Sequence, residues 1–236
     1  MLLQLYLHFP FCKRKCLYCD FCSSAQSAET IAAYCFALKN NLFTMGKKYA
    51  GAKVSTVFLG GGTPSWVSAK DMAGVLDALR SSFDLLPDAE VTSEANPGTL
   101  SAEWLDMAVE HGLNRLSLGV QASQDPLLRT IGRIHTFEEA RQAVRLAKSC
   151  GIPVVLLCQL NRDSAKDEKE PQLYHLRDSG SIEQDADIVL MLERDKNKED
   201  GINIYVRKNR QGRCETFQVV HDEYYANFYE PEKDQF

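Results

Sequence analysis

The stretch Cys12-Lys-Arg-Lys-Cys16-Leu-Tyr-Cys19 decides how this sequence is interpreted. It follows the apolar run Gln4–Phe9, which predicts a β-strand, so the three cysteines fall on one short loop at a strand end. Three thiolates from such a loop can each bind one iron of a cubane and leave the fourth iron open for a small molecule. On spacing alone, free thiols or a zinc ion with Cys22 as fourth ligand remain alternatives.

The composition indicates a folded protein without a membrane span. Hydrophobic residues make up 44% of the 236 residues, and no apolar run approaches the ~20 residues that cross a bilayer. The stretch 1–11 lacks a basic region and is interpreted as a strand, so we expect a cytoplasmic protein. The net charge of -5 argues against bulk nucleic-acid binding but leaves room for a local site.

Strands and helices alternate over the first 150 residues, and Pro153–Leu160 continues the rhythm. Ser68 and Ser101 stand where two helices begin, as N-cap residues do. The alternation predicts an α/β fold with a parallel sheet, here a partial barrel of about four βα units. The expected strands are Gln4–Phe9, Val54–Gly60, Glu90–Asn96 and Arg115–Gln121, and the expected helices are Ala28–Lys47, Ser68–Phe83, Ser101–Glu110 and Phe137–Ser149.

Polar or glycine-rich motifs stand where three of these strands end. They are Gly60-Gly-Gly-Thr-Pro64, Glu94-Ala-Asn-Pro97 and Gly119-Val-Gln121. Each could be an ordinary turn, but the ends of parallel strands share one edge, where α/β sheets and barrels bind ligands. Glycines there let the backbone approach a ligand closely. The motifs together predict a ligand site beside the cysteine loop.

Residues 1–152 resemble the oxygen-independent coproporphyrinogen III oxidase and heme chaperone (HemW) family of radical S-adenosylmethionine proteins. The resemblance rests on Tyr6–Cys12, the cysteine run, the three strand-end motifs and Gly132-Arg-Ile-His135. It is closer to the chaperone members, because the oxidases tend to place a further cysteine where this chain has Phe21.

This resemblance implies two cofactors. Cys12, Cys16 and Cys19 would ligate a 4Fe-4S cluster beside bound S-adenosyl-L-methionine, with the cofactors supplying the radical chemistry. Heme or porphyrin is a further candidate ligand. The positions that match S-adenosylmethionine contacts are Tyr6, Tyr18, Gly61, Gly62, Thr63, Glu94, Gln121 and Arg133.

The pattern of this family ends after residue 152. Its next strand has an Asp in a D-L-x-x-G-L-P stretch, whereas the matching position here is Cys158 and no such stretch occurs in the chain. Residues 153–236 instead resemble the end of a DnaB-type replicative DNA helicase, the last part of a RecA-like ATPase core. The matching stretches are Pro153–Arg162, Leu176–Val189 and Lys208–Gly212.

The helicase resemblance implies a second set of sites, with DNA or helicase subunits as partners. Gln159 would sense the nucleotide, and Arg177 and Gly180 match a loop that follows a DNA backbone. Lys208 and Arg210 match a pair that reaches a neighbouring subunit's γ-phosphate, although two solvated charges at a strand end are the plain alternative. The chain has no G-x-x-x-x-G-K-[ST] loop with which to cradle phosphates.

The charge distribution changes at the same place. Residues 1–152 hold 15 Lys+Arg and 14 Asp+Glu, whereas residues 153–236 hold 12 and 18. We therefore expect a truncated radical S-adenosylmethionine domain over 1–152 and, over 153–236, a helicase-core fragment with antiparallel strands near 186–193, 202–208 and 216–221. We interpret the join as a chimera.

Three functional hypotheses follow from these two resemblances. The first is a radical S-adenosylmethionine 4Fe-4S protein of porphyrin or heme metabolism. The second is a helicase fragment that works only within a complete ring, and the third is a chimera without function. Both halves lack parts of their active sites, so the sequence leaves open whether the chain is an enzyme.

Overall fold

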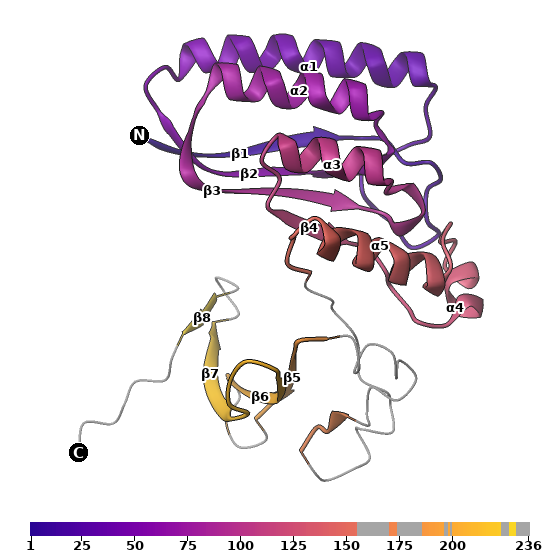
Figure 1. Cartoon of the computed structure of the whole chain (residues 1–236), viewed down its shortest axis with the longest axis vertical. Helices are drawn as coiled ribbons and strands as arrows, with labels where there is room; N and C mark the ends of the chain where they lie inside the picture. Colours follow the sequence, from indigo (N-terminus) through magenta and orange to yellow (C-terminus); the bar gives the residue numbers. More distant parts are fainter. Residues whose placement is uncertain (155–169, 174–185, 196–197, 199, 223–226, 230–236) are drawn as a thin grey trace. The chain divides into compact units, whose positions relative to one another are not determined.

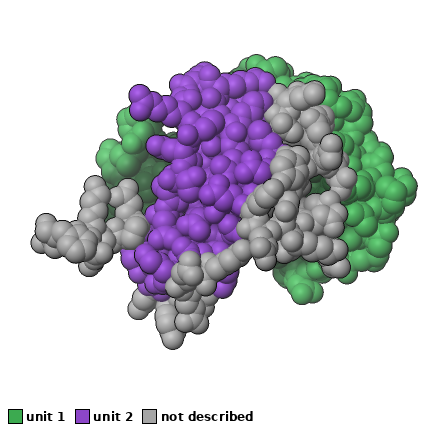
Figure 2. Space-filling model, turned by 90° about the horizontal axis from the view of Figure 1, so that it is seen from below, with its two compact units in different colours: residues 1–158 green, residues 159–236 purple. Residues whose placement is uncertain are grey.

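The computed structural model describes residues 1–154, 170–173, 186–195, 198, 200–222 and 227–229. The chain divides into two compact units, residues 1–158 and 159–236, which Figure 2 colours separately. In the described part of the chain, no helix is long and apolar enough to cross a membrane.

A four-stranded parallel sheet forms the centre of the first unit. Its strands are β1 (Leu2–Phe9), β2 (Lys53–Gly61), β3 (Asp84–Ala95) and β4 (Arg115–Leu118), paired in that order. In Figure 1 the arrows point the same way, so the strand ends share one edge. A sequential order is that of a barrel, whereas a doubly wound sheet reverses its order at a switch point. The partial-barrel prediction is confirmed.

Helices connect the strands, and three of them lie side by side over one face of the sheet in Figure 1. Ser68 and Ser101 are N-caps as predicted, because their hydroxyl oxygens accept hydrogen bonds from the Asp71 and Trp104 backbone N–H groups. The short helix α4 was not predicted. The helices are α1 (Ala28–Lys48), α2 (Ala69–Ser82), α3 (Ala102–Glu110), α4 (Asp125–Thr130) and α5 (Phe137–Ser149), with 3-10 turns η1 (Pro64–Trp66) and η2 (Pro97–Thr99).

The core lies between this sheet and its helices. Phe9 and Leu59 from the strands, and Leu76 and Leu105 from the helices, are at most 1% exposed. Apolar residues buried on the helix-covered face in this way are the main source of a domain's stability. The core therefore holds the strand ends in a fixed arrangement.

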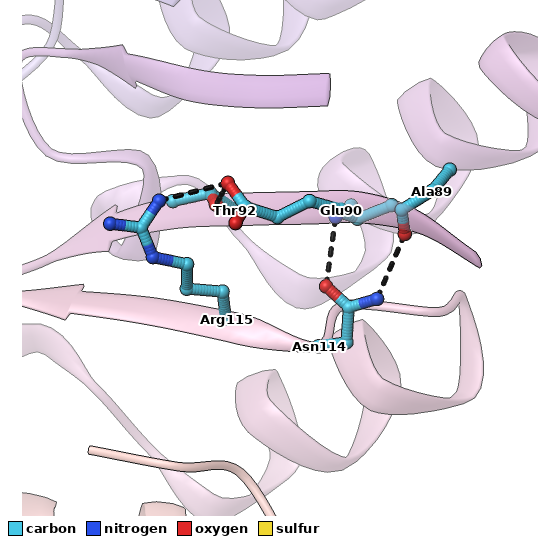
Figure 3. A network of polar contacts seen from close by, with 6 residues as sticks. Ala89, Glu90, Thr92, Asn114 and Arg115 are labelled. Carbon is cyan, nitrogen blue, oxygen red and sulfur yellow. Dashed lines mark hydrogen bonds and ion pairs between the residues drawn. The ribbon is translucent and has the colours of Figure 1, made fainter. Parts of the chain in front are cut away.

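Asn114 sets the pairing of β4 with β3 (Figure 3). Its side-chain oxygen accepts a hydrogen bond from the Val91 backbone N–H at 2.8 Å, and its amide donates to the Ala89 carbonyl at 2.9 Å. One side chain thus binds two backbone groups of β3 just before β4 begins. This register brings the end of β4 level with Glu94 on β3.

An ion pair adds to the same register on the surface. Arg115 lies 2.8 Å from the Glu90 carboxylate, which also accepts a hydrogen bond from the Thr92 hydroxyl (Figure 3). These two hydrogen bonds lower the pKa of Glu90, and the one from Arg115 has the larger effect. The pair is about half exposed, so its contribution to stability is small.

Only the beginning of the expected fifth strand is described. Val154 pairs in parallel with Leu116 of β4, next to the sheet edge. Residues 155–160 of the expected strand lie outside the described residues.

The second unit contains a separate antiparallel sheet. Its strands pair in the order β5 (Ile188–Arg194), β6 (Gly201–Asn209), β7 (Thr216–Asp222) and β8 (Asn227–Tyr229). The three expected strands and their antiparallel pairing are confirmed, and β8 was not predicted. Alternation is clear in β5, where Val189 and Met191 are buried and Leu190 and Leu192 are exposed.

Candidate cluster and cofactor site

The cysteine loop leaves the end of β1 and returns beside it. The Cys12 N–H donates to the Ser24 carbonyl and the Ser24 N–H to the Pro10 carbonyl, both at 3.0 Å. Cys16 and Cys19 are joined by a backbone hydrogen bond of 3.2 Å. All three are free, half-buried thiols, whereas Cys22 is exposed. Backbone hydrogen bonds therefore join the two ends of the loop, and the three cysteines lie on it.

Two side chains from other parts of the sheet edge donate to the cysteine sulfurs. The Thr63 hydroxyl lies 3.4 Å from Cys12 Sγ, and Arg133 Nη1 lies 3.4 Å from Cys16 Sγ. In an iron–sulfur protein such hydrogen bonds tune the cluster potential.

A single metal ion and a cubane place different demands on the three thiols. Over the described residues, no three His, Cys, Asp or Glu side chains lie close enough to share one metal ion. In a cubane each thiolate binds a different iron, so the sulfurs stand farther apart than around zinc. The cluster and zinc alternatives thus differ in how far apart the three sulfurs would stand.

The glycine triplet packs directly against the cysteine loop. The Gly62 N–H donates to the Phe9 carbonyl at 2.8 Å, and the Thr63 N–H to the Phe11 carbonyl at 2.7 Å. A Cβ on Gly62 would lie 2.6 Å from the Phe11 carbonyl oxygen. Gly61 has a φ of +109°, which few other residues tolerate. The backbone thus approaches the loop as closely as glycine allows.

Glu94 and Tyr6 lie on either side of this triplet. Glu94 Oε2 accepts a hydrogen bond from the Gly61 N–H at 3.0 Å. The Tyr6 ring stacks on Phe58, and its hydroxyl is 3.0 Å from His8 Nδ1. Desolvation and then the Glu94 charge raise the pKa of the Tyr6 phenol. Tyr6 and Glu94 thus place polar groups near the glycine triplet, at the sheet edge that carries the cysteine loop.

Arg133 connects the cysteine loop to the end of β4. Besides Cys16 it donates to the Gly119 carbonyl, and its buried Nε has no hydrogen-bond partner among the described residues. A buried donor without a partner is costly, which fits a ligand acceptor at this point. Arg14 holds the Arg133 backbone by donating to the Gly132 and Arg133 carbonyls at 3.0 and 3.1 Å.

The remaining two predicted residues lie around the same arginine. Tyr18 is half exposed; desolvation raises its pKa, and the Arg133 charge opposes the rise. The Gln121 side chain lies close to Gly119, next to Arg133. All eleven residues predicted in the first unit therefore lie along one edge of the sheet and its cysteine loop. Reasoning from sequence treated Arg14 as a positive charge beside the cysteines, and Asn96 and His135 as parts of motifs. It did not predict their contacts with the segments 132–133, 65 and 120, because these contacts join residues far apart in the chain.

The helicase-like residues are described only in part. Lys208 and Arg210 lie at the end of β6, where Arg210 Nη1 is 2.9 Å from the Asp187 carboxylate. Gln159, Arg177 and Gly180, and with them Cys158, lie outside the described residues. Their predicted roles therefore stay predictions.

Comparison with known proteins finds two families in the chain. Residues 6–166 match the family model of the radical SAM superfamily, and residues 132–230 match that of the DnaB-like helicase C terminal domain. The two matches overlap over residues 132–166, around the join expected from the sequence.

Curated relatives include heme chaperones and an oxygen-independent coproporphyrinogen III oxidase. The chain is 42% identical over 151 residues to the heme chaperone HemW of Escherichia coli, covering 64% of this chain and 40% of the relative. It is 35% identical over 154 residues to the oxygen-independent coproporphyrinogen III oxidase of Bradyrhizobium diazoefficiens, covering 63% and 34%. The chain thus spans about two fifths or less of the length of these relatives.

A solved structure shows the same fold. Coproporphyrinogen III oxidase (HemN) from Escherichia coli, a radical SAM enzyme, superposes with a TM-score of 0.59 at 29% identity over 63% of this chain and 34% of that one. Family match, relatives and fold agree over the unit that holds the three cysteines, and the chain belongs to the radical SAM superfamily.

Proposed function

We propose that the first unit binds a 4Fe-4S cluster through Cys12, Cys16 and Cys19 and holds S-adenosylmethionine at the adjoining strand ends. The observation that supports this most directly is Arg133, which touches Cys16 Sγ and the Gly119 carbonyl and keeps a buried Nε without a partner. This arginine joins the proposed cluster ligands to the strand end proposed to hold the cofactor. The related proteins suggest a role in heme or porphyrin metabolism.

The chain's own residues would bind and orient the cofactors. When bound, the cluster supplies an electron and an open iron for the amine and carboxylate of S-adenosylmethionine. Arg133 offers its Nε–H to an anionic group, and Glu94 accepts hydrogen bonds from donors of the ligand. The backbone of Gly61 and Gly62 allows a close approach, and the Thr63 hydroxyl donates a hydrogen bond to Cys12 Sγ.

Anaerobic reconstitution tests the cluster assignment. Wild-type protein should take up about four irons and as many sulfides per chain. Cys19→Ser should lose most of this iron, whereas Cys22→Ser should retain it because Cys22 is no ligand. Uptake of zinc without iron or sulfide, or loss of iron on changing Cys22, would contradict the proposal.

Thiol alkylation of the loaded protein provides a second readout that does not depend on activity. Cys12, Cys16 and Cys19 should be protected only after loading, while the exposed Cys22 and Cys214 should react in both forms. Cys35 serves as an internal reference, because burial and then the Asp71 charge raise the pKa of its thiol to about 11. It should stay unreactive in both forms until the protein unfolds.

Heme is the proposed further ligand, and the support for it is the similarity of the chain to heme chaperones. Titration with heme under anaerobic conditions should give a saturable Soret band if the chain binds it. A cytoplasmic location agrees with seven described cysteines that are all free, as thiols are in a reducing compartment.

The match of residues 132–230 favours a second candidate, association with DNA or with subunits of a helicase. We place the join at residues 152 and 153, within the overlap of the two family matches. Gln159, Arg177, Gly180, Lys208 and Arg210 are the residues proposed for this function. Single-stranded DNA binding that weakens in Arg177→Ala would support it.

A further inference from the structure

Two side chains from one short segment bind consecutive carbonyl groups after β4. Arg133 donates to the Gly119 carbonyl, and His135 Nε2 lies 3.1 Å from the Val120 carbonyl oxygen. The next residue, Gln121, has a φ of +75° and is the one non-glycine residue in the described part of the chain with a positive φ. Arg133 and His135 thus contact the two carbonyl groups that directly precede Gln121, the residue with the positive φ.

His135 is built into the fold and is only 4% exposed. Its Nδ1 lies 3.2 Å from the Asn96 side-chain oxygen, which also accepts a hydrogen bond from the Gly98 N–H at 3.1 Å. Asn96 is tied in turn to Ser65 by a hydrogen bond of 3.2 Å from its backbone N–H. The imidazole therefore lies between the end of β3 and the turn after β4.

A non-glycine residue in the left-handed region persists only where its surroundings impose that conformation. The Val120 carbonyl accepts two contacts, from the Ala122 N–H at 3.0 Å and from His135. The first belongs to the turn itself, and the second ties the turn to the core. We propose that His135 is a positioning residue that fixes the Val120–Gln121 peptide, so that the Gln121 side chain stays beside Gly119 and Arg133, at the strand ends proposed to hold the cofactor.

Only one of the two ring nitrogens of His135 can donate a hydrogen bond in this role. Burial and then the Arg133 charge lower the pKa of the imidazole, which keeps it neutral with a single N–H. Both nitrogens face oxygen atoms, so only one of these contacts is a hydrogen bond donated by the ring. Because the Val120 carbonyl can only accept a hydrogen bond, we assign the single N–H to Nε2, from which it acts on the Val120–Gln121 peptide.

This assignment gives a matched pair of variants. A Gln side chain places its amide nitrogen near the position of imidazole Nε2, whereas an Asn side chain reaches only as far as Nδ1. His135→Gln should therefore keep the donor to Val120, and His135→Asn should lose it while remaining polar and of similar size. His111→Ala is the control, because His111 lies at the end of α3 and binds Met107 and Asp77 instead.

Hydrogen exchange measures the turn directly and needs no ligand. Peptides covering residues 117–123 should exchange faster in His135→Asn than in wild type and at the wild-type rate in His135→Gln and His111→Ala. Peptides from β1 to β3 should not change, which separates loosening of the turn from unfolding. Equal exchange in the Asn and Gln variants, or no change in either, would overturn the proposal.

The role in cofactor binding rests on the proposed function and has its own measurement. In loaded, reduced protein the S-adenosylmethionine-induced change in the cluster EPR spectrum should need about tenfold more ligand in His135→Asn, at unchanged iron content. A normal affinity in that variant would overturn the positioning role. If wild type shows no such change, the proposed function fails, and the exchange experiment still decides whether His135 holds the turn.

Discussion

At the residue scale, Gly62 has no space for a side chain. A Cβ there would lie 2.6 and 2.8 Å from the carbonyl oxygen and nitrogen of Phe11 and 2.8 Å from the Phe9 carbonyl, and all three are backbone atoms. Gly62→Ala must therefore displace the cysteine loop. We expect a loss of about 1–3 kcal/mol in the free energy of unfolding and a fall in iron uptake.

Gly74→Ala is the opposite case and serves as control. Gly74 lies within α2, and a Cβ there would meet only the flexible end of Lys39 at 3.4 Å. Alanine in a helix interior is favoured over glycine, so this variant should gain about 0.5–1 kcal/mol. Urea unfolding of both variants measures the contrast, and similar stabilities would show that the loop tolerates a Cβ at residue 62.

At the element scale, α5 begins with a reciprocal cap. Thr136 Oγ1 accepts a hydrogen bond from the Glu139 N–H at 3.2 Å, and the Glu139 carboxylate accepts one from the Thr136 N–H at 2.7 Å. Thr136→Ala should cost about 1 kcal/mol in the free energy of unfolding. Thr44→Ala within α1 should cost nothing, because its hydroxyl binds only the Asn40 carbonyl one turn before.

The same cap predicts a dependence on pH. Hydrogen bonds from Thr136, the backbone N–H first, lower the pKa of Glu139. The carboxylate therefore stabilises the folded state above the ordinary glutamate pKa of about 4.3, and this contribution is lost as the pH falls through the lowered native value. Glu139→Gln should lose less stability than wild type on acidification from pH 7 to 3, and equal losses in urea unfolding would contradict this.

Strand β4 shows how far the sequence predicts these elements. The apolar run predicted a strand to Gln121, but β4 ends at Leu118. The reason is tertiary, because Arg133 and His135 bind the Gly119 and Val120 carbonyls from beyond α4. Contacts of this kind join distant segments and leave no local periodicity. The strand-end motifs could be predicted to lie together, because parallel strands bring their carboxyl ends to one edge irrespective of the loops that connect them.

At the scale of the whole molecule, the chain belongs to the radical SAM superfamily and also matches part of a helicase domain model. Residues 132–230 match a helicase domain, yet the sequence has no G-x-x-x-x-G-K-[ST] loop. That loop is the one whose backbone N–H groups and Lys cradle the phosphates in P-loop proteins. We expect no ATP hydrolysis above background, with or without single-stranded DNA, in a phosphate-release assay with a complete helicase as positive control.

DNA binding by the chain should be weak for an electrostatic reason. Residues 153–236 hold 12 Lys+Arg against 18 Asp+Glu, so repulsion from the phosphates opposes any local contact. In fluorescence anisotropy we expect a Kd weaker than about 1 μM at physiological salt, the upper end of non-specific affinities. DNA-stimulated ATP turnover, or tight binding that Arg177→Ala abolishes, would contradict this expectation. It would show that the acidic second unit keeps a helicase function that its sequence alone does not support.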